Sequence, residues 1–201
     1  MDGIKQADVV IDFSSPEAVL ENIKTVSNFG KNMVIGTSGW YDSLDQVRGW
    51  VQEANVGLIY GQNFSVGTNI FFKLVAEAAR MADKYGNYDV YGLEVHHKGK
   101  KDSPSGTALK ISEEVMKNFP SKKRLETGRV DGAIEPEVMH FASVRGGRNP
   151  GMHQVVFDSE GDQITLEIAS HNRKTYAAGA LMAAEFIKNK KGMYSFDQLF
   201  K

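Results

Sequence analysis

Residues 7–40 read ADVVIDFSSPEAVLENIKTVSNFGKNMVIGTSGW, and the order of patterns in this stretch decides the fold class that we expect. The apolar, β-branched run at 7–13 is typical of a buried parallel strand, and the run at 32–35 repeats this pattern. Between them, apolar residues at helical spacing predict a helix over 16–29. Residues that favour helix ends flank this helix, namely Ser15 at the N-cap, Pro16 at the first helical position and Gly30 at the C-terminal cap.

The alternation of strand and helix continues beyond residue 40. A second helix is expected over about 43–54 and a third strand over 56–60. The resulting order, strand-helix-strand-helix-strand, is typical of a doubly wound, Rossmann-like α/β sheet. Ligands of such sheets bind beyond the carboxyl ends of the strands, so the segments that follow the strands are candidate binding segments.

Three such segments follow the predicted strands, at 13–15, 36–39 and 61–65. Each offers small residues, backbone donors and side-chain hydroxyls or amides. Any one of them alone is more simply an ordinary turn and helix cap, because those features use the same residue types. Three in succession favour a ligand-binding rim.

The periodicity changes near residue 67. A long helix is expected over 69–84, and two more helices over 106–118 and 176–188. Segments with period-two alternation lie between these helices, at 88–95, 139–145, 153–158 and 163–169. In 163–169, Ile164, Leu166 and Ile168 share one face and the polar residues share the other, which predicts an open, one-sided sheet in an α+β domain. The charged, turn-rich stretch 120–136 is expected to be a surface loop.

We therefore expect an α/β protein of two domains. The boundary between a Rossmann-like sheet domain and an α+β domain with an open mixed sheet is expected near residue 67.

Composition excludes several classes of protein. The 24 basic and 25 acidic residues nearly cancel, so we expect no nucleic-acid or membrane partner. The chain has no cysteine and its five histidines show no metal-ligand spacing, so we expect no metal. Neither a signal-like start nor an apolar run long enough to span a bilayer is present, which makes the cytoplasm the expected location.

Residues 94–110, EVHHKGKKDSPSGTALK, combine groups suited to acid-assisted chemistry. In an extended strand, Glu94 and His96 share one face while His97 lies on the other. Histidine can deliver a proton near neutral pH, and a lysine can stabilise developing negative charge. The helix that starts at Ser105–Thr107 offers free backbone N–H groups, which suit a carboxylate.

A structural interpretation of the same stretch is a solvated lysine-rich loop with an ordinary helix cap. The coincidence of proton donors, cations and an anion-binding helix start favours a site. The remaining histidines, His140, His153 and His171, are expected to have structural roles. The adjacent aromatic residues Phe71 and Phe72 are expected to pack in the core.

The segment EVHHKGKKDSPSGTA closely resembles the signature of the dihydrodipicolinate reductase family. Five further segments resemble family segments in family order: DVVIDFSSPEA, MVIGTSGW, NFSVGTN, FASVRGG and HNRKTYAAGAL. The resemblance implies NADH- or NADPH-dependent reduction of a cyclic unsaturated dicarboxylate to tetrahydrodipicolinate in lysine biosynthesis. It also implies a truncated, Rossmann-like dinucleotide-binding domain at 1–66 and 174–201, a substrate-binding and tetramerisation domain at 67–173, and a homotetramer joined through the open sheet.

The resemblance assigns roles to residues that match the family pattern. His96 is the implied proton donor and Lys100 the implied catalytic cation. The implied substrate-binding residues are His97, Ser105, Gly106, Thr107 and Ser38. The implied cofactor-binding residues are Phe13, Ser14, Gly36, Thr37, Ser38, Gly61, Gln62, Asn63 and Phe64.

The sequence departs from the family pattern at its start, because it contains no Gly-x-Gly-x-x-Gly phosphate loop. That loop normally seats the pyrophosphate of a dinucleotide. We therefore expect weak cofactor binding and no basis for choosing between NADH and NADPH. Two other hypotheses stay open: a non-catalytic binder of dicarboxylates, and an assembly partner that joins full-length subunits through the second-domain sheet.

Overall fold

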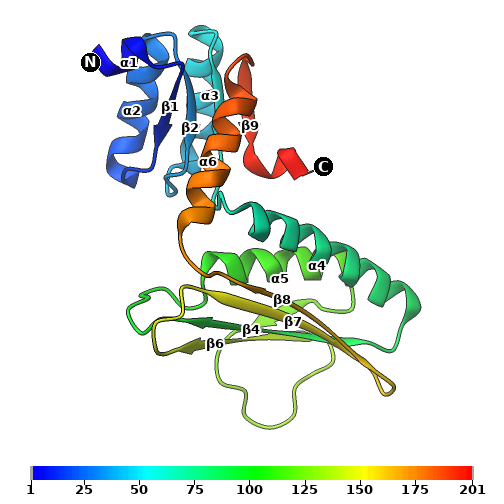
Figure 1. Ribbon diagram of the computed structural model, residues 1–201. Helices are drawn as coiled ribbons and strands as arrows, with labels where there is room; N and C mark the ends of the chain where they lie inside the picture. Colours follow the sequence, from blue (N-terminus) through cyan, green and yellow to red (C-terminus); the bar gives the residue numbers. More distant parts are fainter. Residues whose placement is uncertain (1, 201) are drawn as a thin grey trace. The chain divides into compact units, whose positions relative to one another are not determined.

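The computed structural model describes residues 2–200 and forms two compact units (Figure 1). Unit 1 extends to Asn69 and resumes at Lys174, and unit 2 spans Ile70–Arg173. The first junction lies inside helix α4 (Val66–Tyr85), which begins in unit 1. Assigning the cofactor to one unit and the substrate to the other remains a prediction.

Unit 1 contains a four-stranded parallel sheet in the order β1-β2-β3-β9. Its strands are β1 (Val9–Asp12), β2 (Asn32–Ile35), β3 (Gly57–Tyr60) and β9 (Gly192–Ser195). Its helical segments are α1 (Asp2–Gln6), α2 (Pro16–Asn28), η1 (Tyr41–Ser43), α3 (Leu44–Glu53), α6 (Lys174–Ile187) and η2 (Phe196–Phe200). One apolar cluster joins the sheet to α2 and α3, and a second joins it to α6, so helices cover both faces. The predicted doubly wound order is confirmed.

The ends of α2 show how the local signals act. Gly30 adopts the predicted left-handed conformation, with φ of 66°. Ser15 occupies the N-cap position, but its side chain makes no capping hydrogen bond. The helix start therefore depends on Pro16 and on packing more than on the serine hydroxyl.

The helix expected over 176–188 is α6, but a strand that the sequence did not predict follows it. β9 follows α6 and pairs in parallel with β3, with Gly192 opposite Gly57 and Ser195 opposite Tyr60. Four residues without alternation carry no strand signal of their own. β9 is a strand because β3 supplies its hydrogen-bond partners, and that pairing is not visible in local sequence.

Asn32 joins the sheet of unit 1 to the end of α6. Its buried amide nitrogen donates to the carbonyls of Ile187, Lys188 and Lys190 at 2.6–3.0 Å. Its oxygen accepts from the Gly57 N–H at 2.7 Å. We expect Asn32→Leu to lower the free energy of unfolding by about 3 kcal/mol, since it leaves these backbone groups buried without partners. Urea denaturation would measure the loss, and a change below about 0.5 kcal/mol would contradict this role.

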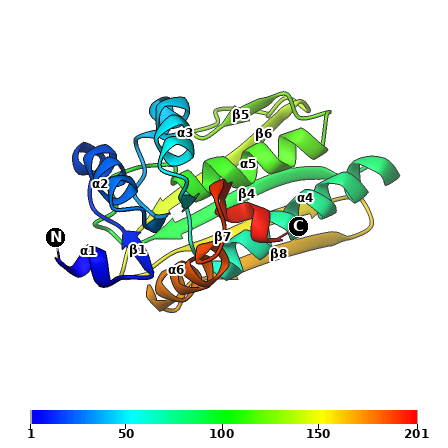
Figure 2. The same cartoon turned by 90° about the horizontal axis from the view of Figure 1, so that it is seen from above.

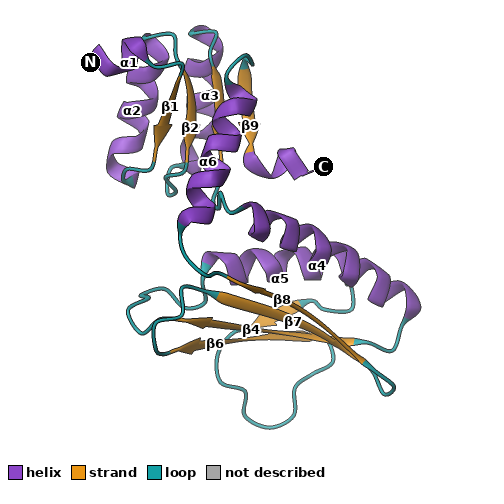
Figure 3. Cartoon of the chain, in the orientation of Figure 1, coloured by secondary structure: helices purple, strands orange, loops and turns teal. Residues whose placement is uncertain are grey.

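Unit 2 contains a five-stranded mixed sheet in the order β5-β6-β4-β7-β8. Its strands are β4 (Asp89–His96), β5 (Arg124–Glu126), β6 (Val138–Arg145), β7 (Met152–Asp158) and β8 (Gln163–Ala169). Helices α4 and α5 (Gly106–Asn118) lie side by side over one face (Figures 1 and 2), where a single apolar cluster forms the core. The other face carries no helix in the described part of the chain, so the predicted open sheet is confirmed (Figure 3).

β5 corrects the expectation that 120–136 is only a loop. Arg124–Glu126 pairs in parallel with Val138–His140. The segment is three residues long, too short for a period-two pattern to stand out. The segment forms a strand because the edge of β6 supplies its hydrogen-bond partners.

The two faces of β4 differ in burial, but the covered face is not the more apolar one. Val90, Gly92, Glu94 and His96 lie on the buried side, whereas Tyr91 is 40% exposed on the open side. No helix among residues 2–200 combines the length and apolar character needed to cross a bilayer.

Candidate active site

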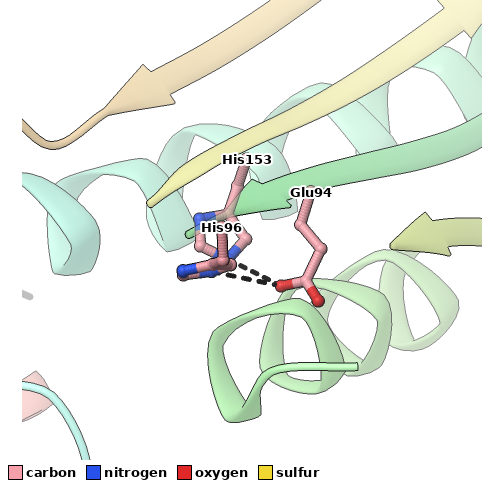
Figure 4. Close-up of side chains that lie close together, drawn as sticks. All are labelled: Glu94, His96 and His153. Carbon is pink, nitrogen blue, oxygen red and sulfur yellow. Dashed lines mark ion pairs between the residues drawn. The ribbon is translucent and has the colours of Figure 1, made fainter. Parts of the chain in front are cut away.

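Glu94 is the centre of the polar cluster in unit 2. Its side chain is fully buried near the carboxyl end of β4. One carboxylate oxygen, Oε1, accepts from the Ser105 backbone N–H at 3.0 Å, the Ser143 hydroxyl at 2.8 Å and Arg145 Nη2 at 2.7 Å. The other oxygen, Oε2, faces His96 Nε2 at 3.4 Å and His153 Nε2 at 3.3 Å (Figure 4).

These contacts determine the charge of Glu94. Burial acts to raise the pKa of the Glu94 carboxyl, but the contact with His153 and hydrogen bonds from Ser105, Arg145 and Ser143 outweigh it and hold the pKa well below its usual range. The carboxylate is therefore ionised at neutral pH. A buried charge requires such partners, because an unpaired one would be very costly.

His96 lies against this carboxylate with little exposure to solvent. Its backbone carbonyl accepts from the Gly146 N–H at 2.9 Å. Gly151 packs against the ring so closely that a Cβ there would come 2.9 Å from His96 Cε1. Burial lowers the pKa of His96, His153 lowers it further, and Glu94 opposes both. The imidazole is thus mainly neutral at pH 7 in the free protein.

The loop after β4 carries the predicted catalytic lysine. Lys100 Nζ contacts the Asp102 carboxylate at 2.8 and 2.9 Å, and its side chain is 20% exposed. Arg145 Nη2 also donates to the Asp102 carbonyl at 2.9 Å. Arg145 therefore connects this loop to Glu94, and holds Lys100 and His96 in one cluster. His97, which directly follows β4, donates its backbone N–H to the Asn149 carbonyl at 2.8 Å.

The start of α5 lies beside the same carboxylate. The hydroxyl of Ser105, the N-cap, accepts from the Ala108 N–H at 3.1 Å and lies 3.1 Å from His153 Nε2. Gly106 is exposed, and a Cβ added there would meet nothing within 4 Å. A ligand can therefore approach this backbone without steric obstruction. The substrate roles of Ser105, Gly106 and Thr107 remain predictions.

Sequence analysis missed His153 and Arg145, which complete the cluster from β7 and β6. His153 was assigned a structural default, yet its ring lies 5.2 Å from that of His96, measured between centroids. The alternation of the strand gave no signal for this, because Tyr91, Leu93 and Val95 form its more apolar face and Glu94 lies on the other. Once buried, the charge of Glu94 needs partners. Which residues supply them depends on strand order.

The ligand atoms of Glu94, His96 and His153 lie within 4.8 Å of one another, close enough to raise the question of a metal ion. The surrounding charges disfavour a cation. Arg145 bonds to the same carboxylate, and the positive charge of Lys100 acts on the same histidine. These two cations therefore oppose the binding of a metal ion at the cluster.

The predicted cofactor-binding segments follow β1, β2 and β3 in unit 1. Asp12, which sequence analysis did not single out, connects the first two. Its Oδ1 accepts from the Ser14 N–H and hydroxyl at 3.0 and 2.8 Å and from the Thr37 hydroxyl at 2.8 Å. Burial raises the pKa of Asp12, yet hydrogen bonds from Ser14, Thr37 and Asn22 leave that pKa lowered. An ionised Asp12 therefore holds the two segments together.

The two aromatic residues of these segments, Phe13 and Phe64, differ in burial. Phe13 is 50% exposed and covers Gly36 so closely that a Cβ there would lie 2.2 Å from its ring. Phe64 packs edge-on against Phe13, with 5.5 Å between centroids, but is buried in the core. Thus Phe13, Ser14, Gly36 and Thr37 come together, whereas the Phe64 side chain belongs to the core.

The remaining predicted residues lie in the loops after β2 and β3. Ser38 and Gln62 are exposed, and Gly61 is partly buried. Asn63 accepts from the Ser65 N–H at 2.8 Å through its side chain. An exposed ring beside small residues and backbone fits the nicotinamide end of a dinucleotide. These cofactor roles remain predictions.

Comparisons with known proteins agree with the signature. The family model "Dihydrodipicolinate reductase, N-terminus" matches residues 2–64, and the model "Dihydrodipicolinate reductase, C-terminus" matches residues 67–200. The chain is 39% identical to the 4-hydroxy-tetrahydrodipicolinate reductase of Ralstonia nicotianae, covering 98% of the chain and 75% of that protein. It is 36% identical to the enzyme of the same name from Methanocaldococcus jannaschii, covering 96% and 71%.

A solved structure extends the likeness to three dimensions. Dipicolinate-bound dihydrodipicolinate reductase from Paenisporosarcina sp. TG-14 superposes with a TM-score of 0.78 and 27% identity, over 96% of this chain and 74% of that one. The N-terminal and C-terminal parts of the chain thus match one family in sequence, and the fold resembles that of a solved member. The chain belongs to the dihydrodipicolinate reductase family.

Proposed function

We propose that the chain catalyses NAD(P)H-dependent reduction of 4-hydroxy-tetrahydrodipicolinate to tetrahydrodipicolinate, a step of diaminopimelate and lysine biosynthesis in the cytoplasm. The observation that supports this most strongly is the buried Glu94–His96 contact next to Lys100 and the start of α5. In a member of this family, His96 would supply an acid, Lys100 a cation, and the start of α5 an anion-binding site.

The substrate is a cyclic dicarboxylate, and unit 2 offers matching groups. The first turn of α5 presents backbone N–H groups and the positive end of the helix dipole to one carboxylate. His97 is proposed to help hold that group from the loop after β4, and Lys100 is proposed to act as the catalytic cation. The exposed Gly106 leaves room for it.

The bound nicotinamide supplies a hydride. His96 is proposed to donate the proton that completes the reduction. Although its imidazole is mainly neutral in the free protein, two substrate carboxylates nearby favour the imidazolium. A positioned acid of this kind typically accelerates a reaction about 10²–10⁴-fold.

The direct test is turnover. Purified chain, reduced cofactor at high concentration and freshly generated substrate should give loss of NAD(P)H absorbance that depends on both substrate and protein. The competing hypothesis, a non-catalytic dicarboxylate binder, predicts binding of pyridine-2,6-dicarboxylate in calorimetry without any oxidation of NAD(P)H. That result would overturn the proposal.

We further propose that the 201-residue chain binds either cofactor weakly, because its sequence lacks the Gly-x-Gly-x-x-Gly phosphate loop. Calorimetric titration with NADH and with NADPH, with and without pyridine-2,6-dicarboxylate, measures this. A nanomolar affinity for NADPH would contradict it.

The open face of the unit 2 sheet is proposed to form a homotetramer. Tyr91 is 40% exposed there and Val144 47% exposed, beside the partly buried Leu93 and Val95. Such a face favours association with another copy. Light scattering should give the mass of four chains. Mixed tetramers with full-length subunits and no activity alone would instead support the assembly-partner hypothesis.

Lys100→Met should lower kcat far more than Lys101→Met. Both substitutions remove one loop cation, but Lys100 is largely covered and held by Asp102, whereas Lys101 is exposed. Removing one electrostatic stabiliser typically costs about 10²–10³-fold in kcat. Steady-state kinetics of the two variants provide the matched comparison. Equal losses of kcat in the two variants would contradict the assignment of Lys100 as the catalytic cation.

A further inference from the structure

The two oxygens of Glu94 have different surroundings. Oε1 receives three donors, from Ser105, Ser143 and Arg145, and these hold the carboxylate in place. Oε2 has no conventional hydrogen bond and is buried, and the side chains of two histidines converge on it. Figure 4 shows both rings turned toward this carboxylate. The oxygen is therefore placed to act on the protonation of the histidines.

The contact orients His96 for its proposed task. With Nε2 facing the carboxylate, the ring favours the tautomer with a proton on Nε2, and Nδ1 is the nitrogen that remains for another partner. The ionised carboxylate also stabilises the imidazolium, as the aspartate does in serine proteases. Packing against Gly151 limits rotation of the ring.

His153 competes for the same oxygen. Its Nε2 lies 3.3 Å from Oε2, and the two rings meet edge to face at 74°. His153 has a second polar neighbour, the Ser105 hydroxyl at 3.1 Å, whereas His96 Nε2 is buried without a hydrogen bond. A positive charge on one imidazole therefore disfavours a positive charge on the other.

We propose that Glu94 and His153 are positioning residues that control the protonation of His96 in opposite directions, with Glu94 stabilising its imidazolium and His153 opposing it. This inference rests on the proposed function, because it concerns the proposed proton donor. It assigns a role to two side chains that the signature segment by itself does not pair.

Four ionisable groups act on His96: Glu94 from β4, His153 from β7, Arg145 from β6 and Lys100 from the loop. Burial lowers the pKa of His96 most, His153 lowers it next, Glu94 raises it, and Lys100 and Arg145 lower it. These directions agree with the opposed roles inferred from the contacts. Glu94 is the only negative group among the four, so none of the other three can stabilise the His96 imidazolium when Glu94 is replaced.

Glu94→Gln and His153→Gln test the inference, since each keeps a polar side chain of similar size. The first readout is the histidine titration followed by NMR, with His96→Gln identifying the His96 signal among the five imidazoles. Glu94→Gln should move the titration of His96 to lower pH, and His153→Gln should move it to higher pH. Glu160→Gln, at an exposed turn, should leave it unchanged.

The second readout is the pH dependence of kcat/KM. A general acid must be protonated, so the rate falls as pH rises through the pKa of His96 in the free enzyme. That fall should occur at lower pH in Glu94→Gln, with at least about a tenfold loss near neutral pH, and at higher pH in His153→Gln. Shifts in the same direction, or no shifts, would overturn the inference.

The two readouts separate this inference from the proposed function. Opposed NMR shifts in a chain without turnover would refute the reductase activity and leave the control of His96 intact. Turnover with unshifted histidine titrations would support the reductase activity and refute the control of His96 by Glu94 and His153. If Glu94→Gln does not fold, His153→Gln alone decides: the titration of His96 must move to higher pH.

Discussion

Replacing His96 by glutamine should reduce kcat by about 10²–10⁴-fold while leaving most of the affinity for pyridine-2,6-dicarboxylate in place. Glutamine keeps an amide that can contact Glu94 Oε2, 3.4 Å from Nε2 in the native protein, but it cannot donate an acidic proton. The loss should therefore appear in the chemical step more than in binding. Steady-state kinetics at saturating cofactor, with calorimetry for the analogue, would separate the two.

His140 provides the matched control for this substitution. It lies on β6 of the same sheet, and its Nε2 is 3.1 Å from the Gly128 carbonyl, outside the Glu94 cluster. His140→Gln should keep kcat within about threefold of the native value, a change below 1 kcal/mol. A native kcat in His96→Gln would exclude His96 as the proton donor, and Lys100 would become the next candidate.

The second large effect concerns stability. Glu94→Leu should lower the free energy of unfolding by about 3–5 kcal/mol at neutral pH, since it removes one member of a buried charged network. Arg145, whose side chain is 19% exposed, loses its carboxylate partner, as do the Ser105 N–H and the Ser143 hydroxyl. Denaturant titration monitored by circular dichroism would measure the difference. Glu160→Leu, at an exposed turn, should stay within about 0.5 kcal/mol of the native protein.

The effect of Glu94→Leu should also depend on pH. The pKa of Glu94 in the folded protein lies below its ordinary value of 4.5, so the unfolded chain binds its proton more readily. The contribution of Glu94 is therefore complete above pH 4.5 and is lost as pH falls toward the folded pKa. The stabilities of the native protein and the variant should converge on acidification. A constant difference would show that the lost packing, and not the charge, causes the effect.

The local patterns of the sequence account for most of the fold. The boundaries of β2, β8 and α5 agree with those predicted, because each segment shows a clear period or a clear cap. β5 and β9 were missed, because their conformation depends on the edges of β6 and β3 and not on their own residues. Short strands of this kind have no signal without their partners.

The chemistry of the site divides in the same way. The sequence by itself determined the doubly wound order, the open sheet and the segment that contains His96, Lys100 and Ser105, since these follow from periodicity and from residues close together in the chain. Only the tertiary structure decided that Arg145 and His153 complete the Glu94 cluster, and that Asp12 joins Ser14 to Thr37. The physical reason is that a buried charge must be satisfied by whatever groups strand order brings to it, and strand order is a property of the whole sheet.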